Sequence, residues 1–563
     1  QGQQENCDRK CEVSMIHIEG KKIPFGGACN KYYNIKHNLK YDVEKLNHTS
    51  YRSDLLFKKY MEQGKNVKPD AKVVGINKSF QIHTLLPLFY NFFTELGLKV
   101  VMPDTVRQSG IDKGMTSFCL SGQVSLGLFE DLLLKKPDYI FSPQIMEMHV
   151  SEQKEYRKEF QTVCMFVQGE PFYQKATFLR GVADGPKMIT PALNFMKGFD
   201  AEEDKFIKIA VELGFSHSEG KKAFDTAFDK QISFFKDMKA EGRRILDELE
   251  KDPNKTAIVL FGRPYNAFAL ETNKGVPFKF ASRGVEIIPY DFLPYEEEEN
   301  YKGTYWEMGQ RIIKAARIVK RHPQLFGCYL TNFLCALDSM MVPHFRDLMG
   351  TKPSLTIEVD GHTADAGVNT RIEAFMDVVK NYLKIRNNIT EKSSDFRRAE
   401  TFIDGQGKAW YIDSEGNKLS FTKDNIKALV PSMGDLFNLG VAASLRKQKW
   451  DAYAMPVCDR EALDLGRSVT TSKECLPIIN IIGEVLKYLK YREDENEKVA
   501  VFLVSAGGCC RVGQYEILMK TVIDKLKLRN VGVVTLANDN GYAGLGVSFR
   551  LDVAKIIYAA DVL

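Results

Sequence analysis

Apolar runs of strand length alternate with amphipathic segments through the first part of the chain. Residues 72–77 (KVVGIN) are apolar enough to form a buried strand, and residues 98–103 and 137–143 have the same character. Residues 83–97 carry apolar side chains at helical spacing and end at a glycine. This alternation is typical of βαβ units, which place helices on both faces of a parallel sheet.

Two further units of the same kind follow along the chain. A strand runs into a tight turn over residues 256–266, residues 284–291 and 324–333 predict further strands of that unit, and a third unit starts from Leu429. Between the first two units, residues 205–251 predict two helices separated by a polar break at Ser216–Gly220. Short β-like runs with D-G and E-G-N turns over 396–421 predict a small β insertion.

The fold class that we expect is therefore α/β, with two or three Rossmann-like parallel-sheet lobes, a helical connector and a small β insertion. The expected boundaries are a cysteine-bearing head and linker (1–66), a first α/β lobe (67–200), the connector (201–253), a second α/β lobe (254–390), the insertion (391–425) and a third α/β lobe (426–563).

The third lobe resembles a copy of the first. Residues 102–133 and 455–489 both run from Met-Pro through a polar loop to Cys-Leu, with a glycine eight residues after the cysteine in an apolar helix. Cys119 therefore occupies the position in the first segment that Cys475 occupies in the second. Each segment is followed by a strand and a further cysteine. The shared order of features indicates a duplication.

Composition narrows the function classes. The chain has 563 residues with 44% hydrophobic and 27% charged residues, which is ordinary for a globular protein. A formal net charge of +5 is small for this length, so it gives no case for a nucleic-acid or membrane partner. No apolar run predicts a membrane span or a signal peptide, so we expect a cytoplasmic protein.

Eleven cysteines carry the candidate chemistry. In a chain without a secretion signal, metal or redox roles are favoured over disulfides. Cys119 and Cys475 precede predicted helices, whose N-termini stabilise thiolates. Cys164, Cys335 and the Cys509–Cys510 pair follow predicted strands, where α/β folds build their sites.

Two interpretations of these cysteines stay open on spacing alone. Thiolates from separate loops, such as Cys119, Cys164 and Cys335, could converge on one iron–sulfur cluster and leave one iron open. The same residues could instead be small buried hydrophobes. For Cys328, inside a predicted strand, and for Cys458 we favour a structural role.

Several longer motifs resemble one known family. Six segments carry the resemblance: FGRPYN (261–266), YWEMGQRI (305–312), LTNFLCALDSMM (330–341), EVDGHTADAGVNTRIEAF (358–375), KECLP (473–477) and GGCCRVGQY (507–515). They are similar to the C-terminal, dehydratase-like region of the 2-hydroxyacyl-CoA dehydratase activase-like fusion proteins. These fusion proteins are related to double-cubane cluster proteins. In that family two actin-like ATPase domains precede this region and drive electrons onto a low-potential iron–sulfur site. No actin-type phosphate loop is visible here, so we do not assign ATP hydrolysis to this chain, and the missing initiator Met fits a start after such domains.

The resemblance implies a set of cluster ligands. Cys119, Cys164 and Cys335 match the three ligand positions of the family, and Cys475 and Cys510 match the first two positions of the second copy. Cys7, Cys11 and Cys29 remain of a head cluster motif in which Gln4 replaces the first cysteine. Arg511 would offset the charge of a cluster, and Arg263 could meet an anionic group such as a cluster or a CoA phosphate, or could be structural.

The family motifs have also drifted. The family pattern C-x-P-x-K followed by H-G-H here becomes CLSGQVSLGL after Cys119, so the proline, the lysine and both histidines are gone. The expected function is an iron–sulfur protein ([4Fe-4S] or double-cubane type) that takes low-potential electrons from the actin-like ATPase activase domains and reduces a small substrate or a partner enzyme. An acyl-CoA or another small molecule is the expected substrate, a homodimer is plausible, and the surroundings would be anaerobic.

Alternatives from other classes stay open. One is a non-catalytic scaffold or assembly protein with a degenerate cluster site, and another is a zinc-binding structural protein that uses the head cysteines. Glu358, Asp360, His362 and Asp365 could bind a divalent cation, although we favour a loop whose side chains cap the helix that begins near Asn369.

Overall fold

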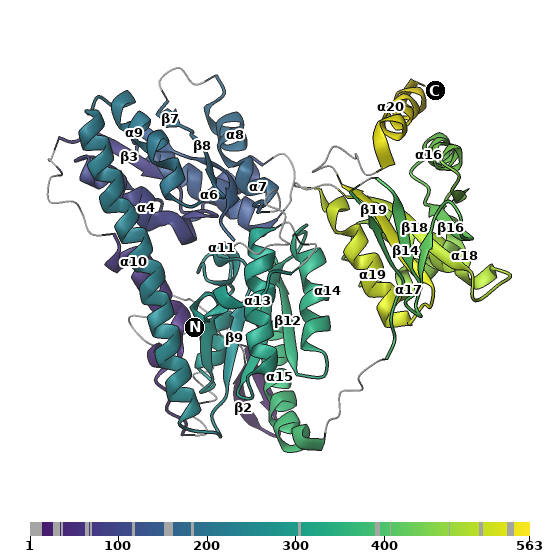
Figure 1. The fold of residues 1–563 in the computed structure, drawn as a ribbon. Helices are drawn as coiled ribbons and strands as arrows, with labels where there is room; N and C mark the ends of the chain where they lie inside the picture. The colour runs from purple at the N-terminus through teal and green to yellow at the C-terminus, as the bar shows by residue number, and fades with distance from the viewer. Residues whose placement is uncertain are drawn as a thin grey trace. The chain divides into compact units, whose positions relative to one another are not determined.

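The chain folds into two compact units. The computed structural model describes residues 14–25, 34, 38–61, 67, 70–114, 119–150, 161–181, 185–301, 304, 306–388, 395–405, 407–471, 473–505, 510–537 and 545–562. The first unit comprises residues 1–301 and 306–390, and the second comprises 302–305 and 391–563 (Figure 1). We describe each unit by itself.

The first lobe of the first unit is a four-stranded parallel sheet. Its strands stand in the order β4 (Lys99–Val101), β3 (Val73–Ile76), β5 (Tyr139–Phe141) and β7 (Lys187–Ile189). Helices α4 (Ile82–Glu95), α5 (Gln108–Asp112) and α6 (Leu120–Leu134) belong to the connections between these strands. The apolar run that predicted the strand at 72–77 is buried because helices cover both faces of a parallel sheet. A separate parallel pair, β6 (Gln144–Met148) and β8 (Ala192–Phe195), completes the lobe.

Two helices follow the first lobe, as the sequence predicted, but the second begins earlier than expected. They are α9 (Glu203–Glu212) and α10 (His217–Glu250). The polar residues predicted to form the break are the first turn of α10. Ser216 and Glu219 form a capping box there, in which each side chain binds the backbone N–H of the other residue. The polar side chains therefore mark the start of the second helix and its cap, whereas the sequence pattern predicted a break between the helices.

Helix α10 packs along α4, where a proline disturbs the helical hydrogen bonds (Figure 1). Pro87 has no N–H to donate to the carbonyl of His83, and Arg52 donates to that carbonyl at 3.0 Å instead. Gln231 of α10 accepts from Leu88 N–H at 3.2 Å and donates to Thr84 O at 3.0 Å. At about 1.5 Å per residue, α10 is about 50 Å long. It also contacts the second lobe at Tyr290–Phe292.

The second lobe repeats the architecture within the same unit. Its parallel strands stand in the order β10 (Glu286–Pro289), β9 (Ala257–Phe261), β11 (Leu325–Asn332) and β12 (Ser354–Val359). Its main helices are α12 (Val276–Ala281), α13 (Glu307–Arg321), α14 (Asp338–Met349) and α15 (Asp365–Ile385).

The second unit contains the third lobe and the β insertion. Its parallel strands stand in the order β17 (Asp451–Ala454), β16 (Ile426–Val430), β18 (Lys498–Ser505) and β19 (Val531–Ala537). The helices are α16 (Asp435–Lys447), α17 (Arg460–Val469), α18 (Leu476–Tyr491), α19 (Tyr515–Leu526) and α20 (Gly546–Val562). The insertion is an antiparallel sheet of β13 (Glu400–Ile403), β14 (Ala409–Ile412) and β15 (Lys418–Ser420). It packs beside β19, where Thr401 Oγ1 donates to Val533 O at 2.6 Å.

All three lobes share one strand order. Counted along the chain, each four-stranded sheet runs second, first, third, fourth. The connection direction therefore reverses between the first and third strands of each lobe, and ligand sites of such sheets form at the carboxyl ends of these two strands. The predicted α/β class with Rossmann-like lobes and a β insertion is confirmed.

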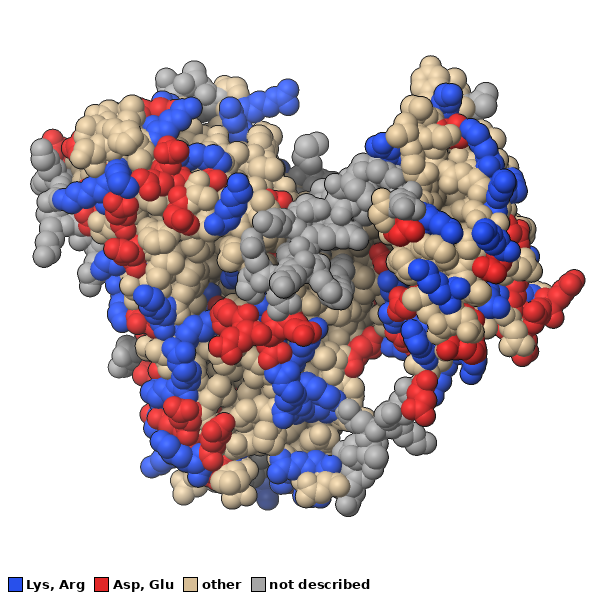
Figure 2. Space-filling view, in the orientation of Figure 1, with Lys and Arg blue, Asp and Glu red and all other residues tan. Residues whose placement is uncertain are grey.

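The surface carries mixed charge. Figure 2 shows Lys and Arg side chains interspersed with Asp and Glu over the visible face, in keeping with the small net charge of +5. Among the residues that the structure describes, no helix is both long and apolar enough to span a bilayer.

Candidate functional site

The five predicted ligand cysteines in the described residues lie at helix starts. Cys119, Cys164 and Cys475 are the residues immediately before α6, α7 (Met165–Gln168) and α18. Cys510 immediately precedes the short helix η8 (Arg511–Gln514), and Cys335 lies in the turn that leads into α14. At such positions backbone N–H groups and the helix dipole favour negative charge on sulfur.

In the first unit, the structure brings three of these cysteines together around Arg263. Burial raises the pKa of the Cys119 thiol to about 11, the Cys164 thiol adds to the shift, and the Arg263 guanidinium opposes it. Burial also raises the pKa of Cys164 and of Cys335, again with Arg263 acting against the shift. The three thiols therefore share one electrostatic environment, to which the first lobe supplies Cys119 and Cys164 and the second lobe supplies Cys335.

Arg263 is held by a fully buried ion pair. It follows β9, and its Nη2 donates to Asp338 Oδ2 at 3.0 Å, with both side chains 1% exposed. Asp338 also accepts from Tyr329 Oη at 2.9 Å and Thr331 Oγ1 at 2.6 Å. The Asp338 backbone N–H donates to Cys335 Sγ at 3.2 Å. The ends of β9 and β11, the first and third strands of this lobe, thus meet at Cys335, as the strand order requires.

One donor of this group has no acceptor. Arg263 Nε is buried and has no hydrogen-bond partner among the residues that the structure describes. An unused buried N–H is unfavourable unless an anionic or polar group occupies the adjacent space. Beside three thiols, this unused donor fits an anionic iron–sulfur cluster.

The described residues do not form a site for a single metal ion. Among them, no three His, Cys, Asp or Glu side chains come close enough to share one ion. A cluster makes a different demand, because each thiolate binds its own iron atom and the ligands stand apart. The chemistry of the donors, three soft thiols and a cation, fits a cluster.

A network of polar side chains that the sequence analysis missed adjoins the thiols. Glu170 is buried and accepts hydrogen bonds from Ser125 Oγ (2.7 Å), Gln174 Nε2 (2.9 Å) and Ser79. Burial raises the pKa of Glu170. Tyr173 donates to Ser125 Oγ at 3.5 Å, and its pKa is raised by burial, with Glu170, Cys119 and Cys164 adding to the shift. No motif marks these residues, and only the Glu170–Gln174 helical spacing hints at the network.

The second unit holds a smaller group around Tyr515. Cys475 Sγ lies 2.8 Å from Tyr515 Oη. The pKa of Tyr515 is raised by burial and by Cys475 and Cys510, while Arg511 opposes the shift. Arg511 Nη1 donates to Lys473 O at 3.4 Å. Both ligand candidates of the second copy and Arg511 are thus neighbours of one tyrosine, at the carboxyl end of β18.

The helices that start at Cys119 and Cys475 are fixed by matching glycine contacts. A Cβ on Gly127 would lie 2.8 Å from Arg107 O, and one on Gly483 would lie 1.8 Å from Ala462 O. On the partner helices, a Cβ on Gly110 would lie 2.7 Å from Leu126 O, and one on Gly466 would lie 2.1 Å from Ile479 O. Gly110 and Gly127 occupy the same places relative to Cys119 as Gly466 and Gly483 do relative to Cys475.

Other predicted candidates lie apart from these groups. Cys328 is buried inside β11, where burial raises its pKa, and it behaves as a small hydrophobe. Cys458 lies in the loop after β17. Cys7, Cys11 and Cys29 lie outside the described residues, as does Cys509.

The acidic loop before α15 forms a local turn. Asp360 Oδ1 accepts from His362 N–H at 2.9 Å and from Thr363 Oγ1 at 2.8 Å. Asp365 pairs with Lys279 at 2.8 Å. Helix α15 begins at Asp365 without a side-chain cap, so the predicted start near Asn369 is four residues late, and the Asp360 contacts stabilise the preceding turn instead of capping the helix.

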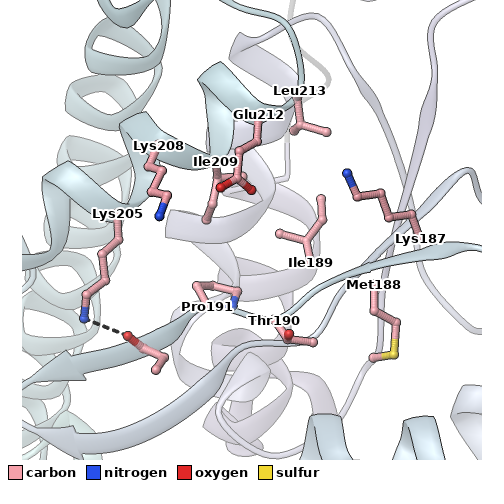
Figure 3. Close-up of a pocket in the computed structure, with 11 residues that line it drawn as sticks. Lys187, Met188, Ile189, Thr190, Pro191, Lys205, Lys208, Ile209, Glu212 and Leu213 are labelled. Atoms are coloured by element: carbon pink, nitrogen blue, oxygen red, sulfur yellow. Dashed lines mark hydrogen bonds between the residues drawn. The ribbon is translucent and has the colours of Figure 1, made fainter.

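A cavity of about 510 Å³ lies beside β7 and α9 in the first lobe (Figure 3). Ile189, Ile209 and Leu213 give it an apolar lining, and Lys187 and Lys208 flank it. Lys205 donates to Ala192 O at 2.7 Å, the contact drawn in Figure 3. This space combines apolar surface with three ammonium groups and the single carboxylate of Glu212, so the balance of charge in its lining favours an amphipathic anion.

Comparison with known proteins assigns one part of the chain. Residues 73–293 match the family model described as CoA enzyme activase uncharacterised domain. The matched segment covers the first lobe, α9, α10 and the start of the second lobe, and it includes Cys119, Cys164 and Arg263. No curated protein matches the chain. Residues 73–293 are therefore similar to an uncharacterised domain that is described for CoA enzyme activases.

Proposed function

We propose that this chain is an iron–sulfur protein that receives low-potential electrons from an ATP-driven activase module and passes them to a small substrate or a partner enzyme. The observation that carries the proposal is the group of Cys119, Cys164 and Cys335 around Arg263, whose Nε is a buried donor without a partner in the described part of the chain. The activase-related match of residues 73–293 supports the same conclusion.

Each residue of this group has a distinct role in the proposal. Cys119, Cys164 and Cys335 would hold a [4Fe-4S] or double-cubane cluster, which supplies one-electron transfer at low potential when bound. Arg263 offsets the negative charge of the thiolates, and Asp338 holds Arg263 in place at 3.0 Å. The Asp338 N–H donates to Cys335 Sγ and orients it. Cys475, Cys510 and Arg511 would provide a second, smaller site.

The test is the iron content of the protein after anaerobic reconstitution with iron and sulfide. We expect stoichiometric iron and acid-labile sulfide and an electron paramagnetic resonance signal after reduction. Cys119→Ala, Cys164→Ala and Cys335→Ala should each lose most of this iron. Cys328→Ala is the matched control, because Cys328 is buried like Cys119 and Cys335 but lies inside β11. Iron only at trace level in the unaltered chain would overturn the proposal.

The same experiment assigns the second copy. If iron falls in Cys475→Ala but not in Cys119→Ala, the working site lies in the second unit. Loss in both variants indicates two sites.

A scaffold or assembly protein with a degenerate cluster site is the second candidate. It is favoured by the lost proline, lysine and histidines after Cys119. This candidate expects an iron-free protein whose Cys119→Ala variant behaves as the unaltered chain does.

The partners belong to the same proposal. Actin-like ATPase activase domains, in the same polypeptide or in another chain, would supply the electrons. An acyl-CoA is the proposed ligand of the cavity beside α9, because the lysines of its lining outnumber its one carboxylate, Glu212, and would meet phosphates while the apolar lining covers an uncharged chain. A cytoplasmic, oxygen-free location and a homodimer complete the proposal.

A further inference from the structure

A second cavity lies in the third lobe, away from the Cys475–Tyr515 pair. It has a volume of about 270 Å³ and opens beyond the carboxyl end of β17, between the loop that starts at Met455 and helix α18. Its lining contains two carboxyl groups (Asp459 and Glu484), two basic side chains, three tyrosines and apolar side chains. None of the proposed cluster ligands lines it.

Of the two carboxyl groups, that of Glu484 is the buried one, at 5% exposed, while Asp459 pairs with Lys487. One oxygen, Oε2, accepts from the Ser432 backbone N–H at 3.0 Å. No cation pairs with Glu484 among the residues that the structure describes. A buried carboxylate without a counter-ion is unfavourable, so the cavity offers a place where a ligand cation would be stabilised.

No hydrogen bond or ion pair joins either basic residue of the cavity to Glu484. Lys487 pairs with Asp459 and, at 3.3 Å, with Glu461. Arg492 Nη1 donates to the backbone carbonyl Glu497 O at 3.4 Å, and its buried Nε has no hydrogen-bond partner in the described part of the chain. Neither residue serves as the counter-ion of Glu484, so the charge of this carboxylate is available to a ligand.

Tyrosine rings form the walls. The rings of Tyr453 and Tyr488 lie 5.7 Å apart at 42°. Tyr488 Oη donates to Glu497 at 2.9 Å and Tyr491 Oη donates to Glu461 at 2.8 Å, so both hydroxyl groups are bound to carboxylates. The rim is unusually apolar for a surface, with Tyr453 42%, Val457 58% and Tyr491 61% exposed.

We propose that this cavity binds a small amphipathic cation, an ammonium group attached to an apolar or aromatic body. The ammonium group would lie against Glu484 and the faces of the tyrosine rings, which attract cations through their quadrupole. The apolar body would cover the exposed rim. A volume of about 270 Å³ is at the small end for ligand sites, so the ligand is a small molecule. This site does not depend on the proposed cluster.

The experiment uses the full chain and three probes with one shared body. These are 2-phenylethylamine, 2-phenylethanol and phenylacetate, which differ only in carrying a cationic, neutral or anionic head group. Calorimetric titration at pH 8 should show that the amine binds at least about tenfold more tightly than the alcohol, which corresponds to about one pKd unit. Phenylacetate should not bind measurably.

Variants locate the binding. Glu484→Gln keeps an acceptor for the Ser432 N–H but removes the charge, so it should weaken amine binding at least about tenfold and leave the alcohol unchanged. Glu495→Gln, an exposed change of the same charge in the same unit, is the matched control and should leave amine binding unaltered. An unfolding curve for each variant confirms that it is folded.

Three results would overturn this inference. They are equal affinity for the amine and the alcohol, unchanged amine affinity in folded Glu484→Gln, and no binding of the amine at millimolar concentration.

Discussion

Arg263 is a buried cation that serves two groups at once. Its Nη2 binds Asp338, and its charge opposes the raised pKa of three thiols. Removing one member of a buried ion pair typically costs about 3–5 kcal/mol, because the other charge is left without a partner. The free energy needed to remove both charges from water offsets much of the stability that such a pair provides. We therefore interpret the position of Arg263 beside the thiols as a sign of a chemical role.

Glu484 is a residue whose protonation should set the pH dependence of stability. Burial raises the pKa of this carboxyl to about 7 from 4.5. Because the folded state binds the proton more tightly than the unfolded state, unfolding free energy falls as pH rises from about 4.5 to 7 and is level above that range.

We therefore expect Glu484→Gln to raise the unfolding free energy at pH 8 by about 1–2 kcal/mol, after allowing for screening, and to leave it unchanged at pH 4.5. Urea unfolding of the second unit at both pH values measures this. The facing groups do not titrate in this range, since Lys487 holds the pKa of Asp459 below its usual value, Asp459 raises that of Lys487, and burial raises that of Cys458. Equal gains at both pH values would contradict the assignment.

At the scale of elements, the glycine contacts fix the helices that begin at Cys119 and Cys475. Gly127 allows α6 to cross the segment at Arg107 with backbone touching backbone, and Gly483 does the same for α18 at Ala462. A flexible side chain could move away from an added Cβ, but a backbone carbonyl that is held by helical hydrogen bonds could not. These crossings set where each cysteine lies.

A Gly127→Ala substitution should destabilise the first unit by about 2–3 kcal/mol, because its Cβ would lie 2.8 Å from Arg107 O and 2.7 Å from Val106 Cγ1. Gly367→Ala in α15 is the matched control: nothing lies within 4 Å of its added Cβ. There, alanine should be neutral or stabilise the helix by up to about 1 kcal/mol. Thermal unfolding of the two variants compares them, and an equal effect would show that the Gly127 crossing is not rigid.

Local sequence pattern predicted the elements well where burial is continuous. The strands around residues 72–77 and 137–143 and in 256–266 were predicted because parallel strands are apolar on both sides. The start of α10 was misplaced because the polar side chains of a capping box look like a loop in sequence. The π-helix at Leu55–Lys59 and the pairing of β6 with β8 have no local signature at all.

Only some residues of the candidate site could be predicted from the local sequence pattern. Cys119, Cys164 and Cys335 could be selected because each adjoins a predicted element end. The Arg263–Asp338 pair joins residues 75 positions apart, and Glu170 and Glu484 sit in unremarkable helical sequence, so neither their burial nor their partners could be predicted. Contacts of this kind depend on tertiary packing.

At the scale of the molecule, the division into two compact units predicts how the chain unfolds. We expect two calorimetric transitions, because domains with separate cores unfold as separate cooperative units. Arg263→Met should lower only the transition of the first unit, and Gly483→Ala, whose Cβ would lie 1.8 Å from Ala462 O, only that of the second. A single transition shifted by both variants would mean that the units are thermodynamically inseparable.

The three clustered cysteines of the first unit come from two lobes. Cys119 and Cys164 belong to the first lobe, and Cys335 belongs to the second lobe together with Arg263. Ser121, two residues after Cys119, accepts from Asn332 at the end of β11 at 3.5 Å. Any group bound by all three thiols is therefore a cross-link across a lobe boundary, and it binds only while the lobes are docked. By mass action, occupancy and docking reinforce each other. Loss of the bound group, for example by oxidation, would therefore weaken the contact between the two lobes and expose the site to water.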